Sequence, residues 1–120
     1  MKIALVDDDK ALIKTLSLVL EKAGHQVSVY HAATSAILDI TDEQPDLVIT
    51  DISMIGMDGL SLIEELRKAP QLSETSYIVI SGNEGEGWEQ KAIVAGARGY
   101  IPKPIDLETF PLQIIKIVRG

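Results

Sequence analysis

The chain has 120 residues, of which 46% are hydrophobic and 24% charged, a balance typical of one globular domain rather than of a disordered segment. The 18 acidic and 11 basic side chains give a formal net charge of −7, which disfavours direct binding to nucleic acid. There is no cysteine, so disulfides and thiolate metal sites are excluded, and no apolar run is long enough to cross a bilayer. We therefore expect one soluble, cytoplasmic domain over residues 1–120.

The first part of the chain alternates between short apolar runs and helical patterns. Residues 3–6 form an unbroken apolar run, which is typical of a strand buried on both faces of a parallel sheet. Apolar residues then recur at helical spacing between Asp9, which fits an N-cap, and Gly24, which fits the position just past a helix C-terminus. Residues 27–30 are predicted to form a second strand and residues 33–41 a second helix.

The same alternation continues to the end of the chain. Further strands are predicted at 47–49, 77–80 and 99–101, and further helices at 60–68, 87–95 and 107–118. Five strands that alternate with five helices predict an α/β sandwich around a parallel sheet, with right-handed crossovers.

Four of the predicted strands end in polar side chains, which are Asp7, Asp8 and Asp9, then Asp51, Ser81 and Lys103. The carboxyl ends of parallel strands share one edge, where ligands bind, so these side chains are expected to meet. Clustered carboxylates repel one another unless a cation lies among them, and Mg²⁺ prefers oxygen ligands. A carboxylate beside Mg²⁺ can attack phosphorus, while Lys103 and Ser81 contact the phosphoryl oxygens. Asp9 fits a helix cap better than a ligand.

In this order and spacing, the motifs resemble the receiver domain of two-component response regulators. The segments that carry the resemblance are LVDDD at 5–9, DLVITD at 46–51 with GMDG at 56–59, ISG at 80–82 and GARGYIPKP at 96–104. The resemblance covers essentially the whole chain. It implies a doubly wound, flavodoxin-like three-layer sandwich, with a five-stranded parallel sheet in the order 2-1-3-4-5 and five helices.

The resemblance also implies a phosphoacceptor site. Asp51 would accept a phosphoryl group from a histidine kinase or a phosphotransfer protein, in a reaction that needs Mg²⁺ or Mn²⁺. Asp8 matches the direct metal ligand of the family, and Asp7 matches the ligand that acts largely through water. The main-chain carbonyl of Ser53 matches the third protein ligand. A receiver catalyses only its own phosphorylation and dephosphorylation, so the resemblance implies a signalling domain and not an enzyme acting on another substrate.

The remaining matches concern the response to phosphorylation. Ser81 matches the hydroxyl that turns toward the phosphoryl group, Tyr100 the aromatic residue that moves inward with it, and Lys103 the lysine that binds the phosphoryl oxygens. The Lys103–Pro104 peptide bond would be cis. The resemblance implies that this switch changes the partner affinity of the face formed by the fourth helix, the fifth strand and the last helix.

The last predicted helix suggests what that face binds. One apolar stripe contains Leu107, Phe110, Ile114, Ile117 and Val118. Leu112 and Ile115 lie off the stripe, and with Trp88 they would form an exposed apolar patch for a homodimer or an output partner. The alternative is that these three residues are scattered surface apolar side chains, which are common in globular proteins.

Three other functions are weighed against a working receiver. A phosphatase of the haloacid dehalogenase type would need Thr or Val four residues after Asp7, where this chain has Ala11. A flavin-binding domain of the same topology would not place three carboxylates where the phosphate binds. A receiver that serves only as a scaffold would not need Asp51, Ser81 and Lys103 together. Both a stand-alone receiver and a receiver from a longer regulator or hybrid kinase fit the sequence.

Overall fold

The computed structural model describes residues 1–83, 85 and 87–120. Its strands are β1 (Lys2–Val6), β2 (Gln26–Tyr30), β3 (Leu47–Asp51), β4 (Ser76–Ser81) and β5 (Gly99–Pro102). Its helices are α1 (Lys10–Lys22), α2 (Ala33–Glu43), α3 (Gly59–Leu66), α4 (Trp88–Ala95) and α5 (Phe110–Arg119), with a short 3₁₀ helix η1 (Pro70–Leu72). No helix in this described part of the chain is both long and apolar enough to span a membrane.

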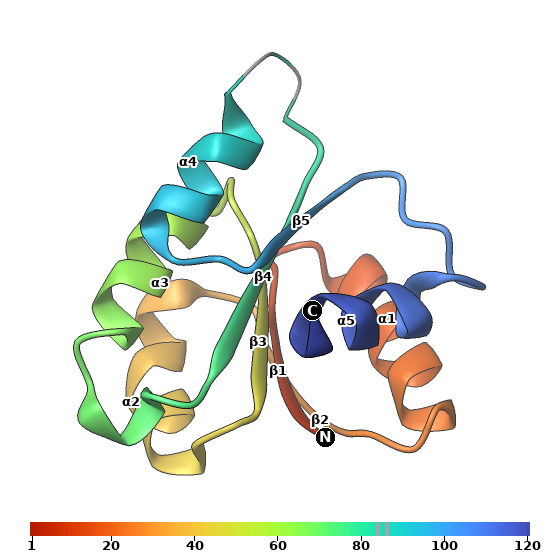
Figure 1. Cartoon of the computed structure of the whole chain (residues 1–120), viewed down its shortest axis with the longest axis horizontal. Helices are drawn as coiled ribbons and strands as arrows, with labels where there is room; N and C mark the ends of the chain where they lie inside the picture. Colours follow the sequence, from red (N-terminus) through yellow and green to blue (C-terminus); the bar gives the residue numbers. More distant parts are fainter. Residues whose placement is uncertain (84, 86) are drawn as a thin grey trace.

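The strands form one parallel sheet in the order β2-β1-β3-β4-β5. Figure 1 shows the sheet between two layers of helices, with α1 and α5 on one face and α2, α3 and α4 on the other. The predicted doubly wound, flavodoxin-like three-layer sandwich is therefore confirmed.

Burial explains why the strands appear in the sequence as unbroken apolar runs. Every residue of β3 and β4 is buried, because helices cover both faces of the central strands. Successive side chains point to opposite faces. Val48 and Val79 thus join the core beneath α2, α3 and α4, whereas Ile49 and Ile78 join the core beneath α1 and α5.

Local capping sets the ends of the first helix. The Asp9 carboxylate accepts a hydrogen bond from the Leu12 N–H at 3.1 Å, so the predicted N-cap is confirmed. At the other end Gly24 has a φ of 95°, a left-handed conformation that glycine adopts without strain. Asp9 therefore starts α1 directly after the acidic end of β1, and Gly24 follows its other end.

The last helix differs from its prediction, because it begins at Phe110 and not at 107. The Asp106 carboxylate accepts a hydrogen bond from the Glu108 N–H at 3.0 Å, and residues 107–109 form a turn before the helix. Leu107 is 40% exposed and does not belong to the buried stripe, and Ile105 packs against that core in its place. The 3₁₀ turn at 70–72 is a further difference from the predicted elements.

A glycine fixes the approach of α3 to the end of β3. The Gly59 N–H donates to the Ile52 carbonyl at 2.9 Å, and a Cβ at position 59 would collide with the main-chain oxygen of Asp51. The absence of a side chain at Gly59 therefore lets the helix pack directly against the backbone of Asp51.

Replacing Gly59 by alanine is expected to destabilise the fold by about 1–3 kcal/mol, since the backbone must shift to admit the methyl group. Urea denaturation measures this change. Gly82→Ala is the matched control, because among the described residues its Cβ would meet only the Lys103 side chain, at 3.8 Å. Its cost is expected to stay within about 0.5 kcal/mol. Equal costs for the two variants would contradict the close approach.

Candidate functional site

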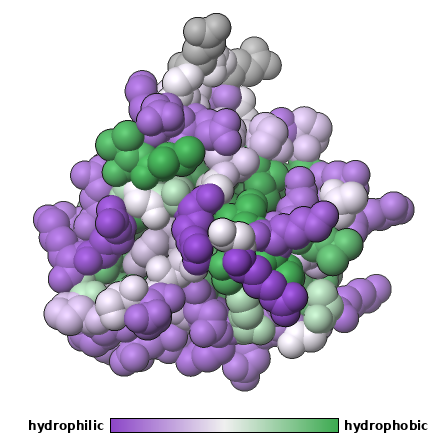
Figure 2. Space-filling model, viewed as in Figure 1, coloured by the Kyte–Doolittle hydropathy of each residue, from purple (hydrophilic) through white to green (hydrophobic). Residues whose placement is uncertain are grey.

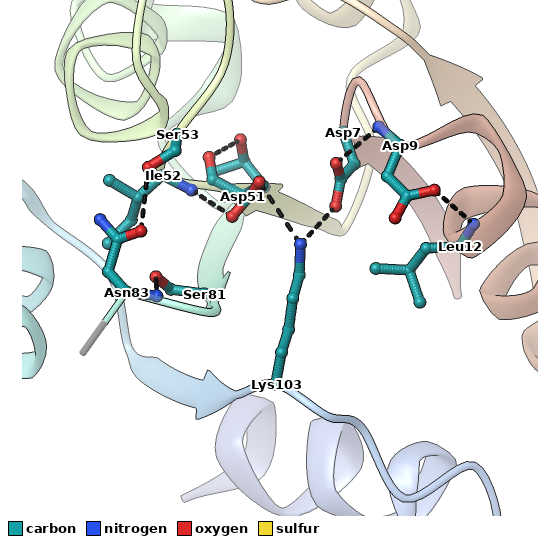
Figure 3. A network of polar contacts seen from close by, with 10 residues as sticks. Asp7, Asp9, Leu12, Asp51, Ile52, Ser53, Ser81, Asn83 and Lys103 are labelled. Atoms are coloured by element: carbon teal, nitrogen blue, oxygen red, sulfur yellow. Dashed lines mark hydrogen bonds and ion pairs between the residues drawn. The ribbon is translucent and has the colours of Figure 1, made fainter.

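The carboxyl ends of β1, β3 and β5 bring Asp7, Asp51 and Lys103 together (Figure 3). The Lys103 Nζ lies 3.1 Å from Oδ2 of Asp7 and 3.4 Å from Oδ2 of Asp51. Lys103 follows the edge strand β5, so its side chain extends across the sheet edge toward β1. The Lys103–Pro104 peptide bond is cis, as the resemblance implies. One ammonium group thus bridges two carboxylates from distant parts of the chain.

Three carboxylates form a cluster that could hold a divalent cation. Oxygens of Asp7, Asp8 and Asp51 all lie within 4.8 Å of one another. Asp7 and Asp51 are 1% and 6% exposed, whereas Asp8 is exposed to solvent. This set offers only oxygen ligands and one open side, which fits Mg²⁺ or Mn²⁺ with water in its shell. Asp9 is not in the cluster and caps α1.

The burial of like charges determines the electrostatics of this cluster. Desolvation raises the pKa of Asp51, the nearby Asp7 carboxylate raises it further, and Lys103 only partly opposes both effects. Burial alone would lower the pKa of Lys103, but its hydrogen bond and attraction to Asp7 and to Asp51 raise it. Lys103 therefore stays charged, and the site keeps an excess of negative charge that an added cation would neutralise.

Ser81 lies at the end of β4 and is buried. Its hydroxyl oxygen accepts a hydrogen bond from the Asn83 N–H at 2.9 Å. The Ser53 hydroxyl in turn donates to Oδ1 of Asn83 at 2.9 Å, which links the loop after β3 to the loop after β4 (Figure 3). This link was not predicted, because residues that lie 30 positions apart give no periodic signal in the sequence. The only feature of the sequence that pointed to this link is that Ser53 and Asn83 each lie two positions after the end of a strand.

Tyr100 and Trp88 both lie on the α2–α3–α4 side of the sheet. Tyr100 is half-buried and packs against the core there. Trp88 packs against the same core and lines a hollow with Met54 and Leu60. Asp8 of the acidic cluster lines the same hollow, and the predicted grouping of Trp88 with Leu112 and Ile115 of the last helix stays a prediction.

The predicted output face, formed by α4, β5 and α5, has exposed apolar side chains on both of its helices. On α5, Leu112 is exposed and Ile115 is half-buried. On α4, the exposed apolar side chains are Ile93 and Val94, and Figure 2 shows hydrophobic residues gathered over this helix. The sequence of α4 shows that Ile93 and Val94 are apolar residues of a helix. It does not show that both side chains are exposed to solvent.

This fold and site agree with comparisons to known proteins. Residues 3–115 match the family model of the response regulator receiver domain, and the chain belongs to this family. It is 31% identical to protein PilH of Pseudomonas aeruginosa over 99% of this chain and 98% of that protein. A solved structure of a putative response regulator from Chloroflexus aurantiacus superposes with a TM-score of 0.91 at 25% identity, covering 99% of this chain and 98% of that one.

Longer relatives match over part of their length. The chain is 31% identical to the virulence transcriptional regulatory protein PhoP of Salmonella typhimurium, and it spans 52% of that protein. A receiver domain is a signalling module of two-component systems, so membership implies a kinase or a phosphotransfer partner.

Replacing Asp51 by asparagine is expected to stabilise the protein in cation-free buffer at neutral pH, because the buried charge is removed. Because the pKa of Asp51 is raised on folding, its stabilising contribution is present below the unfolded-state pKa and is lost as the pH rises. At neutral pH its charge therefore costs stability, and the amide removes that cost. Urea denaturation in EDTA provides the measurement.

Asp42→Asn is the control for this prediction, because Asp42 is an exposed carboxylate on α2. Its effect is expected to stay within about 0.5 kcal/mol. A loss of stability in Asp51→Asn would mean that attraction to Lys103 outweighs both burial and repulsion from Asp7.

Proposed function

We propose that residues 1–120 form one receiver domain in which Asp51 accepts a phosphoryl group from a phosphohistidine of a kinase or a phosphotransfer protein. The observation that carries the proposal is the position of the Asp51 carboxylate, which is nearly buried and lies 3.4 Å from the Lys103 ammonium, inside a cluster of three carboxylates. Nucleophile, cation and candidate metal ligands thus lie at one strand edge, as phosphoryl transfer requires.

In the proposed step, an oxygen of Asp51 forms a bond to phosphorus while the phosphorus–nitrogen bond to the donor imidazole breaks. The electron pair of that bond stays on the imidazole nitrogen. The Ile52 N–H donates to Oδ1 of Asp51 at 2.9 Å and orients the carboxylate, and Lys103 binds a phosphoryl oxygen as a point charge. Asp7, Asp8, Asp51 and the main-chain carbonyl of Ser53 would hold Mg²⁺ or Mn²⁺, which when bound supplies further positive charge to these oxygens.

We propose that the same residues start the switch. The new phosphoryl group adds roughly −1.5 to −2 charge at Asp51. The Ser81 hydroxyl gives up the Asn83 N–H, turns toward a phosphoryl oxygen and leaves space that Tyr100 fills. The face formed by α4, β5 and α5, with Leu112 and Ile115 exposed or half-buried on it, then changes its affinity for an output partner or a second copy of the chain. No other substrate is turned over.

Incubation with acetyl phosphate and Mg²⁺ is expected to add one phosphoryl group to the chain, measured as intact mass. Asp51→Asn is expected to abolish the gain, and EDTA is expected to reduce it strongly, because the site then lacks the charge that balances its carboxylates. A gain that survives in Asp51→Asn would place the acceptor elsewhere. No gain, under conditions that modify another receiver, would favour a phosphorylation-independent scaffold.

The Ser81→Ala variant is expected to take up the phosphoryl group but to transmit the change poorly. The amide resonances of Tyr100 and of α4 and α5 should shift upon phosphorylation in the wild type, and these shifts should fall by more than half in the variant, because no hydroxyl follows the phosphoryl group. Nuclear magnetic resonance of ¹⁵N-labelled protein measures them. Ser17→Ala on α1 serves as the control, and wild-type shifts in Ser81→Ala would argue against the switch.

A further inference from the structure

An open hollow of about 480 Å³ lies directly beside the acidic cluster. One wall comes from the loop after β3 and the start of α3, and the other from the loop after β4 and the start of α4. Its described lining residues are Asp8, Ile52, Ser53, Met54, Ile55, Asp58, Leu60, Asn83 and Trp88. Asp8 also belongs to the carboxylate cluster, and Ser53 follows Asp51 by two residues, so the hollow and the phosphoacceptor site are continuous.

The hollow combines apolar walls with an acidic rim. Met54, Leu60 and Trp88 are partly buried and pack against the core beneath α2, α3 and α4, so their positions are held by the fold. The Lys91 ammonium lies 4.5 Å from the centroid of the Trp88 ring, which further restrains the indole. Ile55 is 88% exposed and offers an apolar side chain to any group that enters the hollow.

We propose that this hollow binds the apolar group that a phosphodonor carries next to its phosphoryl group. For a protein donor, the occupant is an aromatic or aliphatic side chain that flanks the donor histidine. The inference rests on the proposed function and adds a specificity-determining subsite, formed mainly by Ile55 and Trp88, to the phosphoacceptor site.

Two properties of the hollow favour an apolar group of the donor, namely its continuity with the phosphoacceptor site and the negative charge around it. A donor that brings phosphorus to the Asp51 carboxylate places its neighbouring atoms over the surface that adjoins the site, and this hollow is part of that surface. The carboxylates of Asp8 and Asp58 at the rim, together with the net charge of −7, repel an anionic group. The indole and the aliphatic walls gain from removing apolar surface from water. The matching group is therefore apolar, on a donor surface that is neutral or basic.

Acetyl phosphate and benzoyl phosphate form a suitable pair of probes. With either donor, an Asp51 oxygen bonds to phosphorus, the phosphorus–oxygen bond to the acyl group breaks, and acetate or benzoate leaves with the electron pair. The two leaving groups are of similar basicity, but only benzoate carries a large apolar ring. The measured quantity is the ratio of second-order rate constants, benzoyl over acetyl, followed by intact mass at equal Mg²⁺.

The wild-type ratio is expected to exceed that of Trp88→Ala by about tenfold, from the loss of one aromatic wall. Comparing variants cancels the intrinsic reactivity of the two donors, and a general disturbance of the site would lower both rate constants and leave their ratio unchanged. Ile55→Ser is expected to lower the ratio severalfold, and it should not affect folding because Ile55 is so exposed. Leu38→Ala, which removes a 79% exposed leucine on α2, is the matched control.

The outcomes separate this inference from the function on which it rests. An unchanged ratio in both Trp88→Ala and Ile55→Ser would overturn the subsite while leaving Asp51 as the acceptor. A lower ratio in Leu38→Ala as well would also overturn it, because the effect would then not be confined to the hollow. If neither donor modifies the wild type, the proposed function fails and the subsite fails with it.

Discussion

The Lys103 ammonium between Asp7 and Asp51 is the interaction on which the functional end of the molecule depends. Two carboxylates that are almost wholly buried would repel each other at short range without it, and burial already raises the pKa of Asp51. The lysine comes from the last strand, so the carboxylate edge has a bridging cation only when β5 is in place. The charge balance of this carboxylate pair therefore depends on the correct placement of β5 in the sheet.

Much of this arrangement could be predicted from the sequence because it follows from burial. The central strands are covered on both faces, so their residues form unbroken apolar runs, and polar residues follow where each strand reaches the edge. Asp9 and Gly24 mark the ends of α1 through capping preferences that act over a few residues. The meeting of Asp7, Asp51 and Lys103 follows from parallel topology alone.

The features that sequence analysis missed depend on contacts that have no local signal. The start of α5 differs from the prediction because residues 107–109 form a turn, next to which the Asp106 carboxylate accepts a hydrogen bond from the Glu108 N–H. The link between Ser53 and Asn83 joins two loops whose distance is set by the packing of α3 and α4.

The position of Trp88 also makes the protein its own optical reporter. It is the one tryptophan in the chain, its ring centroid lies 4.5 Å from the Lys91 ammonium, and it lines the same hollow as Asp8. Indole emission depends on nearby charge and on contact with water. Occupancy of the acidic cluster or of the hollow can therefore be followed in unlabelled protein, and libraries of compounds could be screened by emission alone.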